Sequence, residues 1–353
     1  MRYYEGVRAF ITGHTGFKGS WLSAWLKQDG ADVAGISFAP EPGRPSLFDE
    51  ARIAAGMQSH IGDIRDFDLV RKVMNDTRPQ IVFHLAAQPL VRQSYRDPIE
   101  TFGSNVMGTV HVLEAARSCP SVQAVVCVTT DKVYENREWE WGYREIDPLG
   151  GKDPYSASKA AAELVAASYR QTLLPMAGDI RMATVRGGNV IGGGDWSEDR
   201  LVPDLVRSLE SDKPITLRNP GSIRPWQHVL ELVDAYLHLG RHLLDGDVAA
   251  GGAWNFGPDR GNEVTVERLV SDMLMAWGGE AVPVLVEPSP LREANFLRLD
   301  IAKAAQNLAW SPILDFVQTI RLTADWYSRR HRGEAPAALL AEQLAWYRTR
   351  RGR

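Results

Sequence analysis

The sequence is poor in cysteine, because only Cys119 and Cys127 among its 353 residues carry a thiol. Two cysteines cannot form the disulfide framework of a small secreted domain, and they cannot supply a multi-cysteine zinc site. Cys127 also lies within an apolar run. We therefore expect two reduced thiols in a cytoplasmic protein, and no metal centre.

Long hydrophobic runs are missing as well. Nowhere do about 18 apolar residues follow one another, as a membrane-spanning helix requires. The N-terminal residues lead from Arg2 into a short apolar segment, without the longer apolar stretch of a cleavable signal peptide. The sequence thus predicts a cytoplasmic location and no membrane partner.

A strong excess of one charge is the third absence. The 40 Lys and Arg residues oppose 44 Asp and Glu residues, which gives a net charge of -4. Such a balance provides no general attraction to nucleic acid, so a bound anion must be held by a local site. Hydrophobic residues make up 44% and charged residues 24%, which argues against a disordered chain. At about 150 residues per domain, the length suggests two domains.

The first half of the chain alternates short apolar runs with segments of helical periodicity. Residues 7–12 and 32–37 have the pattern of strands, and residues 18–29 between them have the period of a helix. The alternation continues through residues 67–75, 80–86, 99–117, 124–129, 155–173 and 179–186. It predicts an α/β fold in which residues 1–186 form a Rossmann domain, a doubly wound parallel sheet with helices on both faces.

The second half has a different composition. From Gly187 onward glycine and proline become frequent, and helical stretches sit between short irregular pieces. This pattern predicts a smaller C-terminal α/β domain in residues 187–353 that binds the substrate, although the chain can cross between the two units. Residues 337–353 predict a helix that ends in a basic run, and we expect a solvated end there.

A glycine-rich turn follows the first expected strand. Gly13, Gly16 and Gly19 are spaced G-x-x-G-x-x-G and lead into a helix that begins near Phe17. In this context, such glycines let backbone N–H groups approach a pyrophosphate at the positive end of the helix. The alternative is a structural turn that only requires positive φ. The strand–turn–helix context favours a dinucleotide site.

Two further positions bear on the cofactor. Asp63 follows another expected strand, and it is either an acceptor for an adenine amino group or a helix cap. The second strand ends at Ser37, where NAD-binding folds usually carry an acid for the ribose 2′-hydroxyl. Because serine bonds a hydroxyl or a phosphate, and Arg44 lies nearby in the sequence, these residues leave NAD and NADP both open.

Tyr155 and Lys159 form a Y-x-x-x-K pair at the start of a helical segment, which places both side chains on one helical face. An ammonium group beside a phenol favours the phenolate, which can remove a proton from a sugar hydroxyl as its hydride leaves for a nicotinamide. The pair taken alone fits equally well a packed tyrosine and a solvated lysine.

The apolar strand at residues 124–129 leads into Thr130, Asp131 and Lys132. Ligands of parallel α/β sheets bind outside the carboxyl ends of the strands. Thr130 is placed to share the hydrogen bond of the substrate hydroxyl with Tyr155. Asp131, if protonated, can give a proton to a leaving hydroxyl. The alternative for Asp131 and Lys132 is a solvated turn pair.

Residues 13–19, the Tyr155/Lys159 pair and Thr130 together resemble the extended short-chain dehydrogenase/reductase family that acts on nucleotide sugars. Longer strings resemble its CDP-glucose branch of 4,6-dehydratases, and they are TTDKVYENREWEWGYREIDPLGGKDPYSASK from position 129, RGGNVIGGGDW from position 186 and IRPWQHVLE from position 223. With HLAAQPLVRQSY from position 84 and WNFGP from position 254, the resemblance covers nearly the whole chain.

The resemblance implies roles for individual residues. Hydride transfer is implied for Thr130, Tyr155 and Lys159, and elimination for Asp131 with Lys132. Cofactor contacts are implied for Gly13, Thr15, Gly16, Phe17, Gly19, Asp63, Ile64, Leu85, Ala86, Ala87, Tyr155 and Lys159. Contacts to the nucleotide sugar are implied for Gln88, Asn189, Arg200, Arg224 and His228. Arg224 suits a diphosphate, since a guanidinium can bind it with two hydrogen bonds, whereas Gln88 and His228 fit a structural polar role equally well.

One position departs from the wider group, which usually carries Glu as the C5 base after the strand-end Asp. Here that position is Lys132, as in the CDP-glucose branch, so its neutral amine is a candidate for removing the C5 proton.

The resemblance implies NAD as the cofactor and CDP-glucose as the substrate. The implied reaction is oxidation at C4, loss of water across C5 and C6, and return of the hydride to C6. The alternatives are another nucleotide-sugar 4,6-dehydratase, a 4-epimerase or, from a different class, a dinucleotide-sensing protein without turnover. The resemblance also implies a homodimer, or a dimer of dimers, that is built from helices in residues 99–117 and 155–173.

Overall fold

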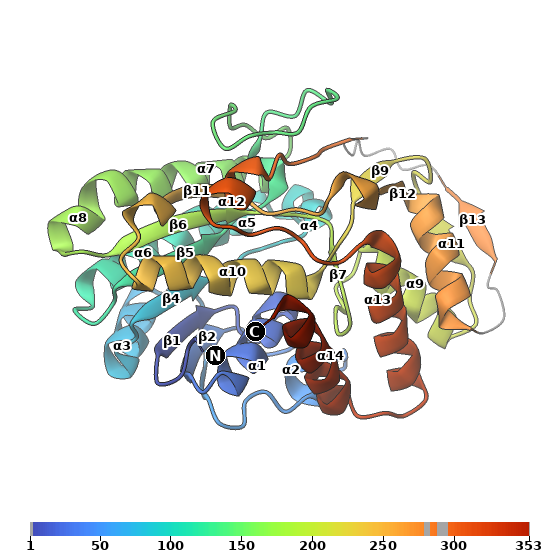
Figure 1. Ribbon diagram of the computed structural model, residues 1–353, viewed down its shortest axis with the longest axis horizontal. Coiled ribbons are helices and arrows are strands. Elements are labelled where there is room, and N and C mark those ends of the chain that lie inside the picture. The colour runs from blue at the N-terminus through green and yellow to red at the C-terminus, as the bar shows by residue number, and fades with distance from the viewer. Residues whose placement is uncertain (1–2, 279–282, 288–295, 353) are drawn as a thin grey trace.

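The computed structural model describes residues 3–278, 283–287 and 296–352. Seven parallel strands form its central sheet, in the order β11-β6-β5-β4-β1-β2-β3 (Figure 1). The strands are β1 (Arg8–Thr12), β2 (Asp32–Ser37), β3 (Gln58–Ile61), β4 (Ile81–His84), β5 (Ala124–Val128), β6 (Arg181–Arg186) and β11 (Gly252–Asn255). The strand order reverses between β1 and β4, and a crevice for ligands lies at such a reversal. The doubly wound Rossmann fold is thus confirmed.

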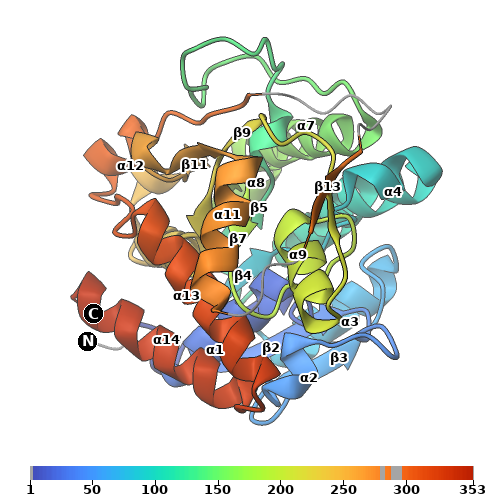
Figure 2. The same cartoon turned by 90° about the vertical axis from the view of Figure 1, so that its right-hand side faces the viewer.

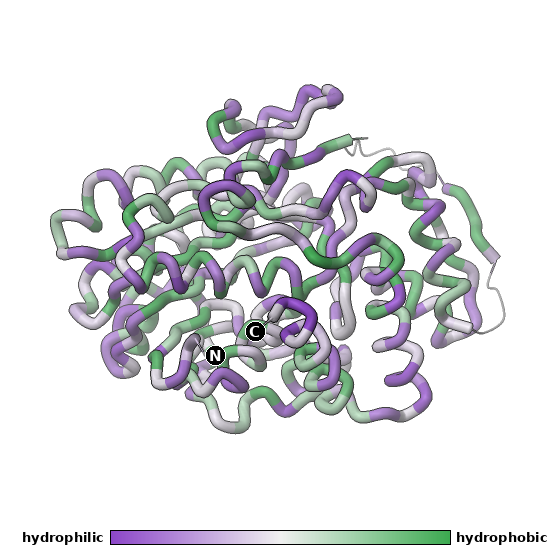
Figure 3. The backbone as a smooth tube through the Cα atoms, in the orientation of Figure 1, coloured by the Kyte–Doolittle hydropathy of each residue, from purple (hydrophilic) through white to green (hydrophobic). Residues whose placement is uncertain are grey.

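Helices cover both faces of the sheet because side chains alternate along each strand. Ala9 and Ile11 of β1 belong to one core, and Phe10 between them belongs to the other. The first core packs under α1 (Phe17–Gln28) and α10 (Val229–Leu244), and the second under α3 (Phe67–Thr77), α6 (Gly108–Ser118) and α7 (Pro154–Ser168). In Figure 3, hydrophobic residues gather along the strands and hydrophilic residues mark the outer helices and loops.

The long segments expected at residues 99–117 and 155–173 are helical but not uniform. The first consists of α5 (Pro98–Phe102), a π-helical turn (Gly103–Met107) and α6. The second consists of α7 and a π-helical turn (Tyr169–Leu173), which α8 (Leu174–Ala177) follows. Within the described residues, no helix combines the length and the apolar character that crossing a membrane requires.

The smaller C-terminal unit lies beside the carboxyl ends of the strands, and Figure 2 views the molecule from its side. Its helices are α9 (Leu201–Glu210), α11 (Val266–Trp277) and α13 (Phe316–His331). Its strands form three separate pairs. β7 (Val190–Ile191) pairs with β10 (Gln227–His228), β8 (Ile215–Leu217) with β13 (Val284–Val286), and β9 (Ile223–Pro225) with β12 (Glu263–Thr265). However, β11 and α10 return to the central sheet. After residue 187 the chain therefore returns to the central sheet.

The C-terminal helix α14 (Pro336–Arg351) contradicts the expectation of a solvated end. Leu344 and Tyr347 are fully buried, and Tyr347 donates a hydrogen bond to Glu231 of α10 at 2.8 Å. Arg351 forms an ion pair with buried Asp234 at 2.8 Å. The prediction was wrong because the basic run looks solvated in the sequence, whereas Arg351 pairs with Asp234 of α10 and Arg348 with Asp29 at the end of α1, both more than 100 residues earlier.

Candidate active site

The glycine turn lies between β1 and α1, at the carboxyl edge of the sheet. Gly13 has a φ of 78°, and a Cβ there would come within 2.8 Å of the backbone nitrogen of Ala86. A Cβ at Gly19 would overlap the carbonyl oxygen of Gly13. Gly16 is the N-cap of α1, and Phe17 is its first residue. The turn therefore lies flat over the end of β4 and leaves the positive end of α1 facing the crevice, which suits a pyrophosphate.

The end of β2 carries Ser37, and its hydroxyl lies 2.7 Å from that of Thr15. Thr15 also donates to the carbonyl of Phe38 at 2.8 Å. Arg44, the residue nearest in sequence that could hold a 2′-phosphate, forms ion pairs with Glu41 and Glu198. Two carboxylates at this guanidinium disfavour a further phosphate.

Asp63 lies in a turn after β3 and bonds Arg65. Its carboxylate accepts hydrogen bonds from the backbone and the side chain of Arg65, both at 2.8 Å. Burial raises the pKa of Asp63, but these bonds outweigh burial and the pKa is lowered. Asp66, not Asp63, caps α3, so the helix-cap alternative for Asp63 was wrong. An adenine amino group would share this carboxylate with Arg65.

The residues after β4 border the same crevice. The backbone nitrogens of Leu85 and Ala86 donate to the hydroxyl of Thr12, at 3.2 and 3.1 Å. Gln88 is buried, and its side-chain amide bonds the backbone of Leu90 and the hydroxyl of Thr101. Ala87 stands between these positions, and Ile64 is buried in the second core. The contacts of Gln88 favour its structural alternative over a substrate contact.

Asp131 stands at the centre of the site, in a short turn after β5. Its carboxylate accepts hydrogen bonds from Thr130 Oγ1 at 2.9 Å and Asn189 Nδ2 at 3.2 Å, and it pairs with Lys132 Nζ at 3.4 Å. Its side chain is only 3% exposed. Three donors thus surround a buried carboxylate. The solvated-pair alternative is wrong for Asp131, which is buried.

Lys132 is an ammonium group rather than a neutral amine. The charge of Asp131 raises the pKa of Lys132 above its ordinary value, in spite of burial. The neutral base that the sequence suggested therefore requires that the proton first moves to Asp131.

Tyr155 is buried at the start of α7. Burial raises the pKa of its phenol, while the charge of Lys132 and a hydrogen bond with Thr130 act in the opposite direction. Lys159, one turn later on the same helix, donates to the carbonyl of Val128 at 3.3 Å. The structure thus brings Tyr155, Thr130 and Lys132 together, and it names Lys132 as the cation that most favours the phenolate.

The candidates for the sugar side divide into two groups. Asn189, with a φ of 51°, reaches Asp131, and Arg200 pairs with Asp195 at 2.9 Å and acts on the pKa of Tyr155. Arg224 of β9 lowers the pKa of Lys132 and so faces the same cluster. By contrast, His228 is fully buried and caps α10, where Nδ1 accepts from the Leu230 nitrogen at 3.3 Å. The burial of His228 and its role as a helix cap favour the structural alternative, and its substrate contact stays a prediction.

Sequence reasoning missed Lys18, which lies between Phe17 and Gly19. Its amine donates to the hydroxyl of Tyr236 on α10 at 3.4 Å. Burial, together with the charges of Lys159 and Arg200, lowers the pKa of Lys18 to about 7. The available signal was a single charge at the start of a helix that is otherwise apolar over FKGSWLSAWL.

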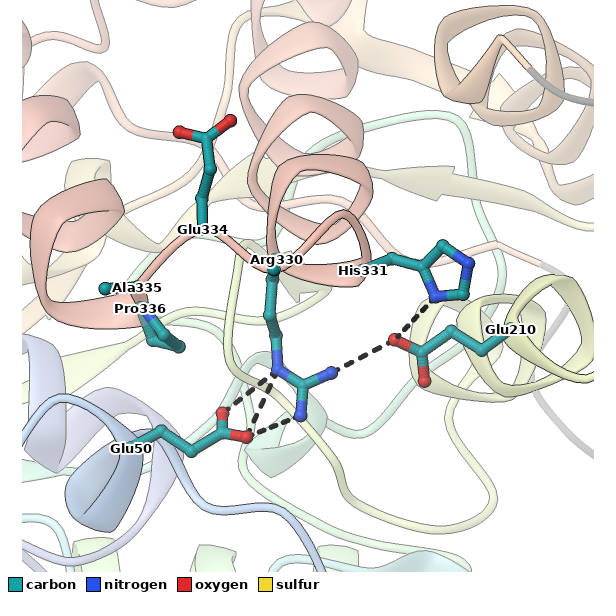
Figure 4. A pocket seen from close by; sticks show the side chains of 8 residues that line it. Glu50, Glu210, Arg330, His331, Glu334, Ala335 and Pro336 are labelled. Carbon is teal, nitrogen blue, oxygen red and sulfur yellow. Dashed lines mark hydrogen bonds and ion pairs between the residues drawn. The ribbon is translucent and has the colours of Figure 1, made fainter.

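A separate hollow of about 500 Å³ lies between α2 (Leu47–Glu50), α9 and the end of α13. Figure 4 shows Arg330 at its wall, where it pairs with Glu50 and, at 3.1 Å, with Glu210. These carboxylates occupy the guanidinium, so the hollow offers no evident anion site.

Comparison with known proteins agrees with this geometry. The model of the NAD dependent epimerase/dehydratase family matches residues 9–257. The chain belongs to this family. It is 48% identical over 336 residues to a CDP-glucose 4,6-dehydratase of Salmonella typhimurium, which covers 94% of this chain and 93% of that protein.

Two solved structures extend the comparison. A UDP-glucose 4-epimerase of Thermus thermophilus in complex with NAD has a TM-score of 0.78 and 26% identity, over 93% of this chain and 99% of that one. A dTDP-glucose 4,6-dehydratase of Streptomyces venezuelae with NAD bound has a TM-score of 0.79 and 24% identity, over 94% of this chain and all of that one. At 24% identity, the likeness to the second structure shows a shared fold alone.

Proposed function

We propose that this protein is a CDP-glucose 4,6-dehydratase, which converts CDP-D-glucose to CDP-4-dehydro-6-deoxy-D-glucose and water. The observation that carries the proposal is the presence of two functional pairs in one cleft, Thr130 with Tyr155 and Asp131 with Lys132. The first pair suits oxidation of a hydroxyl, and the second suits elimination. The relative at 48% identity, which is named for this activity, supports the choice of substrate.

The residues present fit NAD. The glycine turn can close against the start of α1 because a Cβ at Gly13 would clash with the backbone of Ala86, and one at Gly19 with the carbonyl oxygen of Gly13. Ser37 and Thr15 offer hydroxyls to a ribose, and the paired Arg44 favours NAD over NADP. NAD⁺ held at this turn would supply the hydride acceptor for C4 and the hydride donor for C6.

Oxidation at C4 requires a base for the O4 proton, and Tyr155 fills this role. The charge of Lys132 and the hydrogen bond of Thr130 favour its phenolate against the effect of burial. Thr130 orients the same hydroxyl from the end of β5. A base of this kind typically contributes about 10² to 10⁴ in rate.

Elimination follows because the C4 ketone acidifies the proton at C5. Asp131 and Lys132 hold one transferable proton between them, and it rests on Lys132. Transfer of this proton to Asp131 produces a carboxylic acid and a neutral amine. The acid can then protonate the C6 oxygen as water leaves, while the amine removes the C5 proton.

The charged residues on the C-terminal side hold the nucleotide diphosphate in this proposal. The charge of Arg224 acts on Lys132 and that of Arg200 on Tyr155, and guanidinium groups bind phosphates with paired hydrogen bonds. Asn189 orients Asp131 rather than the sugar alone.

The 4-epimerase alternative shares the cofactor turn and the Tyr155/Lys159 pair. It does not explain a buried acid that pairs with Lys132, because epimerisation expels no hydroxyl. A dinucleotide-sensing protein without turnover would require none of Thr130, Asp131 and Tyr155.

We also propose a homodimer, or a dimer of dimers, through the helices around α5 and α7. Large apolar side chains are exposed on these segments, with Ile99 85% and Leu164 63% exposed. Phe102 and Met107 add to this surface. A two-fold axis would bring the same helices of two subunits together.

The experiment for the substrate offers the purified protein NAD⁺ and equal concentrations of CDP-, dTDP-, UDP- and GDP-glucose. The alkali-developed absorbance of the 4-keto product is followed. A pocket that bonds one base leaves polar groups unpaired with another, so we expect CDP-glucose to react fastest. Equal or faster reaction of dTDP-glucose would overturn the choice of nucleotide, and no keto product from any substrate would overturn the dehydratase.

A further inference from the structure

A buried ion pair lies beneath the reacting residues. Glu163 stands one helical turn after Lys159 on α7, and its Oε2 accepts a hydrogen bond from Arg186 Nη2 of β6 at 2.8 Å. The two side chains are 3% and 4% exposed. Thr184 Oγ1 donates to the same Glu163 oxygen at 2.9 Å. A buried pair of this kind gives little net stability, because desolvation offsets the attraction of the charges.

Glu163 also fixes the end of β5. Thr129 Oγ1 donates to Glu163 Oε1 at 2.5 Å. Thr129 stands between Val128, whose carbonyl accepts the hydrogen bond from Lys159, and Thr130, which bonds Tyr155 and Asp131. One carboxylate therefore connects α7 to the strand end that carries the acid and the hydroxyl.

Arg186 connects the end of β6, the third segment, to Glu163. It is the last residue of β6, and Gly188 and Asn189, which contact Asp131, follow after Gly187. Its Nη1 donates to the hydroxyl of Tyr134 at 2.8 Å. The Glu163–Arg186 pair is thus shared by all three segments that meet in the cleft.

The charge of Glu163 acts on Lys159. The titratable groups that act on Lys159 are Lys18 of α1, His84 of β4, Cys127 of β5 and Glu163 of its own helix. Burial lowers the pKa of His84 to about 3 and raises that of Cys127 to about 12, so both are neutral. Burial lowers the pKa of Lys159, and Cys127 and Glu163 oppose this effect. Of these two, only Glu163 forms an ion pair, with Arg186 at 2.8 Å.

We propose that Glu163 is a positioning residue of the reaction. Paired with Arg186, its carboxylate keeps Lys159 charged and holds α7 in register with the catalytic ends of β5 and β6. Only the kinetic test of this inference depends on the proposed function.

The test compares Glu163→Gln with wild type over a range of pH. We expect activity to fall toward alkaline pH as Lys159 loses its proton, and to begin falling at lower pH without the Glu163 charge. A shift of about one pH unit makes the charged fraction about tenfold smaller on the alkaline side. We expect kcat to change more than KM, because the substrate contacts are untouched.

Two controls separate charge from packing. Glu163→Asp keeps the charge, and we expect it to retain most of the wild-type activity on the alkaline side of the pH profile. Thr184→Val removes one hydrogen bond to Glu163 but no charge, so we expect a lower melting temperature and an unchanged pH profile. If Glu163→Gln does not fold, Glu163→Gln/Arg186→Gln replaces it, because this variant leaves no unpaired buried arginine.

Calorimetric binding of NAD⁺ over the same pH range gives a readout without turnover. We expect binding by Glu163→Gln to weaken at lower pH than binding by wild type. A folded variant with the wild-type pH dependence in both measurements would overturn the inference. A wild type that binds NAD⁺ but leaves CDP-glucose unchanged would contradict the proposed function and not the role of Glu163.

Discussion

Gly188 lies directly against the carboxylate of Asp131, so closely that a Cβ at position 188 would overlap the side-chain atoms of Asp131. Gly188 follows β6 and precedes Asn189, which donates to the same carboxylate. The absence of a side chain at position 188 therefore allows the loop after β6 to enclose Asp131 from below. This contact explains why Asp131 is buried although it lies at a strand end.

Gly188→Ala should displace Asp131 from Thr130 and Asn189 and lower turnover. Because elimination needs Asp131 near the C6 oxygen, we expect a loss on the order of 10² in kcat, comparable to removal of an acid. Gly221→Ala is a matched control, since a Cβ there meets no atom within 4 Å in the described structure. Wild-type turnover in Gly188→Ala would show that the position of Asp131 does not limit the reaction.

Asp131→Asn should slow elimination more than oxidation at C4. The amide preserves the shape and the bonds from Thr130 and Lys132 in part, but it cannot give an acidic proton to the C6 oxygen. After rapid mixing with CDP-glucose, we expect the absorbance of reduced nicotinamide to accumulate above the wild-type level. Absorbance no higher than that of wild type would rule out Asp131 as the eliminating acid.

The docking of α14 should depend on pH through Glu231. Burial raises the pKa of Glu231 from its ordinary 4.5 to about 7, although Tyr347 donates to its carboxylate. Because the carboxyl group of Glu231 binds its proton more tightly in the folded protein, it stabilises the fold fully at pH values below 4.5. This stabilisation is lost as the pH rises through about 7. It is on the order of 3 kcal/mol.

Glu231→Gln removes this titration. The melting temperature of the variant, relative to that of wild type, should therefore rise as the pH increases from about 5 to about 8. Glu342→Gln, which changes an exposed carboxylate on α14, is the control and should leave the slope almost unchanged. Parallel curves for wild type and Glu231→Gln would mean that Glu231 does not titrate in this range.

The proposed dimer should dissociate when its apolar surface is charged. Ile99→Arg with Leu164→Arg introduces two exposed cations, which cannot be buried between subunits without a large cost. Light scattering should give at least twice 39.2 kDa for wild type and 39.2 kDa for the variant. Val248→Arg changes a side chain that is 82% exposed outside these helices and should leave the mass unaltered. A wild-type mass of 39.2 kDa at micromolar concentration would contradict the proposal.

The sequence predicted the sheet well where strands are apolar on both faces. β4 and β5 are buried at every position, and β1 and β6 at every position after the first, so their pattern is strong. β3 (QSHI) is partly exposed and polar, and its bounds were not predicted. β11 joins the sheet from far along the chain, and no local pattern reports such a pairing.

Only part of the site was predicted, namely the residues whose position follows from the topology of the sheet. Strand ends and a helix start place Thr130, Asp131 and Tyr155 together, and the topology alone dictates this meeting. Which cation faces Tyr155, and that Lys18 is buried nearby, depend on side-chain packing between distant elements.

The central claim is tested most directly by the mass of the product that wild-type protein forms from CDP-glucose labelled with deuterium at C4. Water should be lost across C5 and C6, and the hydride removed from C4 should return to C6 of the same sugar. The account predicts a product lighter by one water that retains the deuterium, now on the C6 methyl group. A product of unchanged mass, as a 4-epimerase would form, would contradict it.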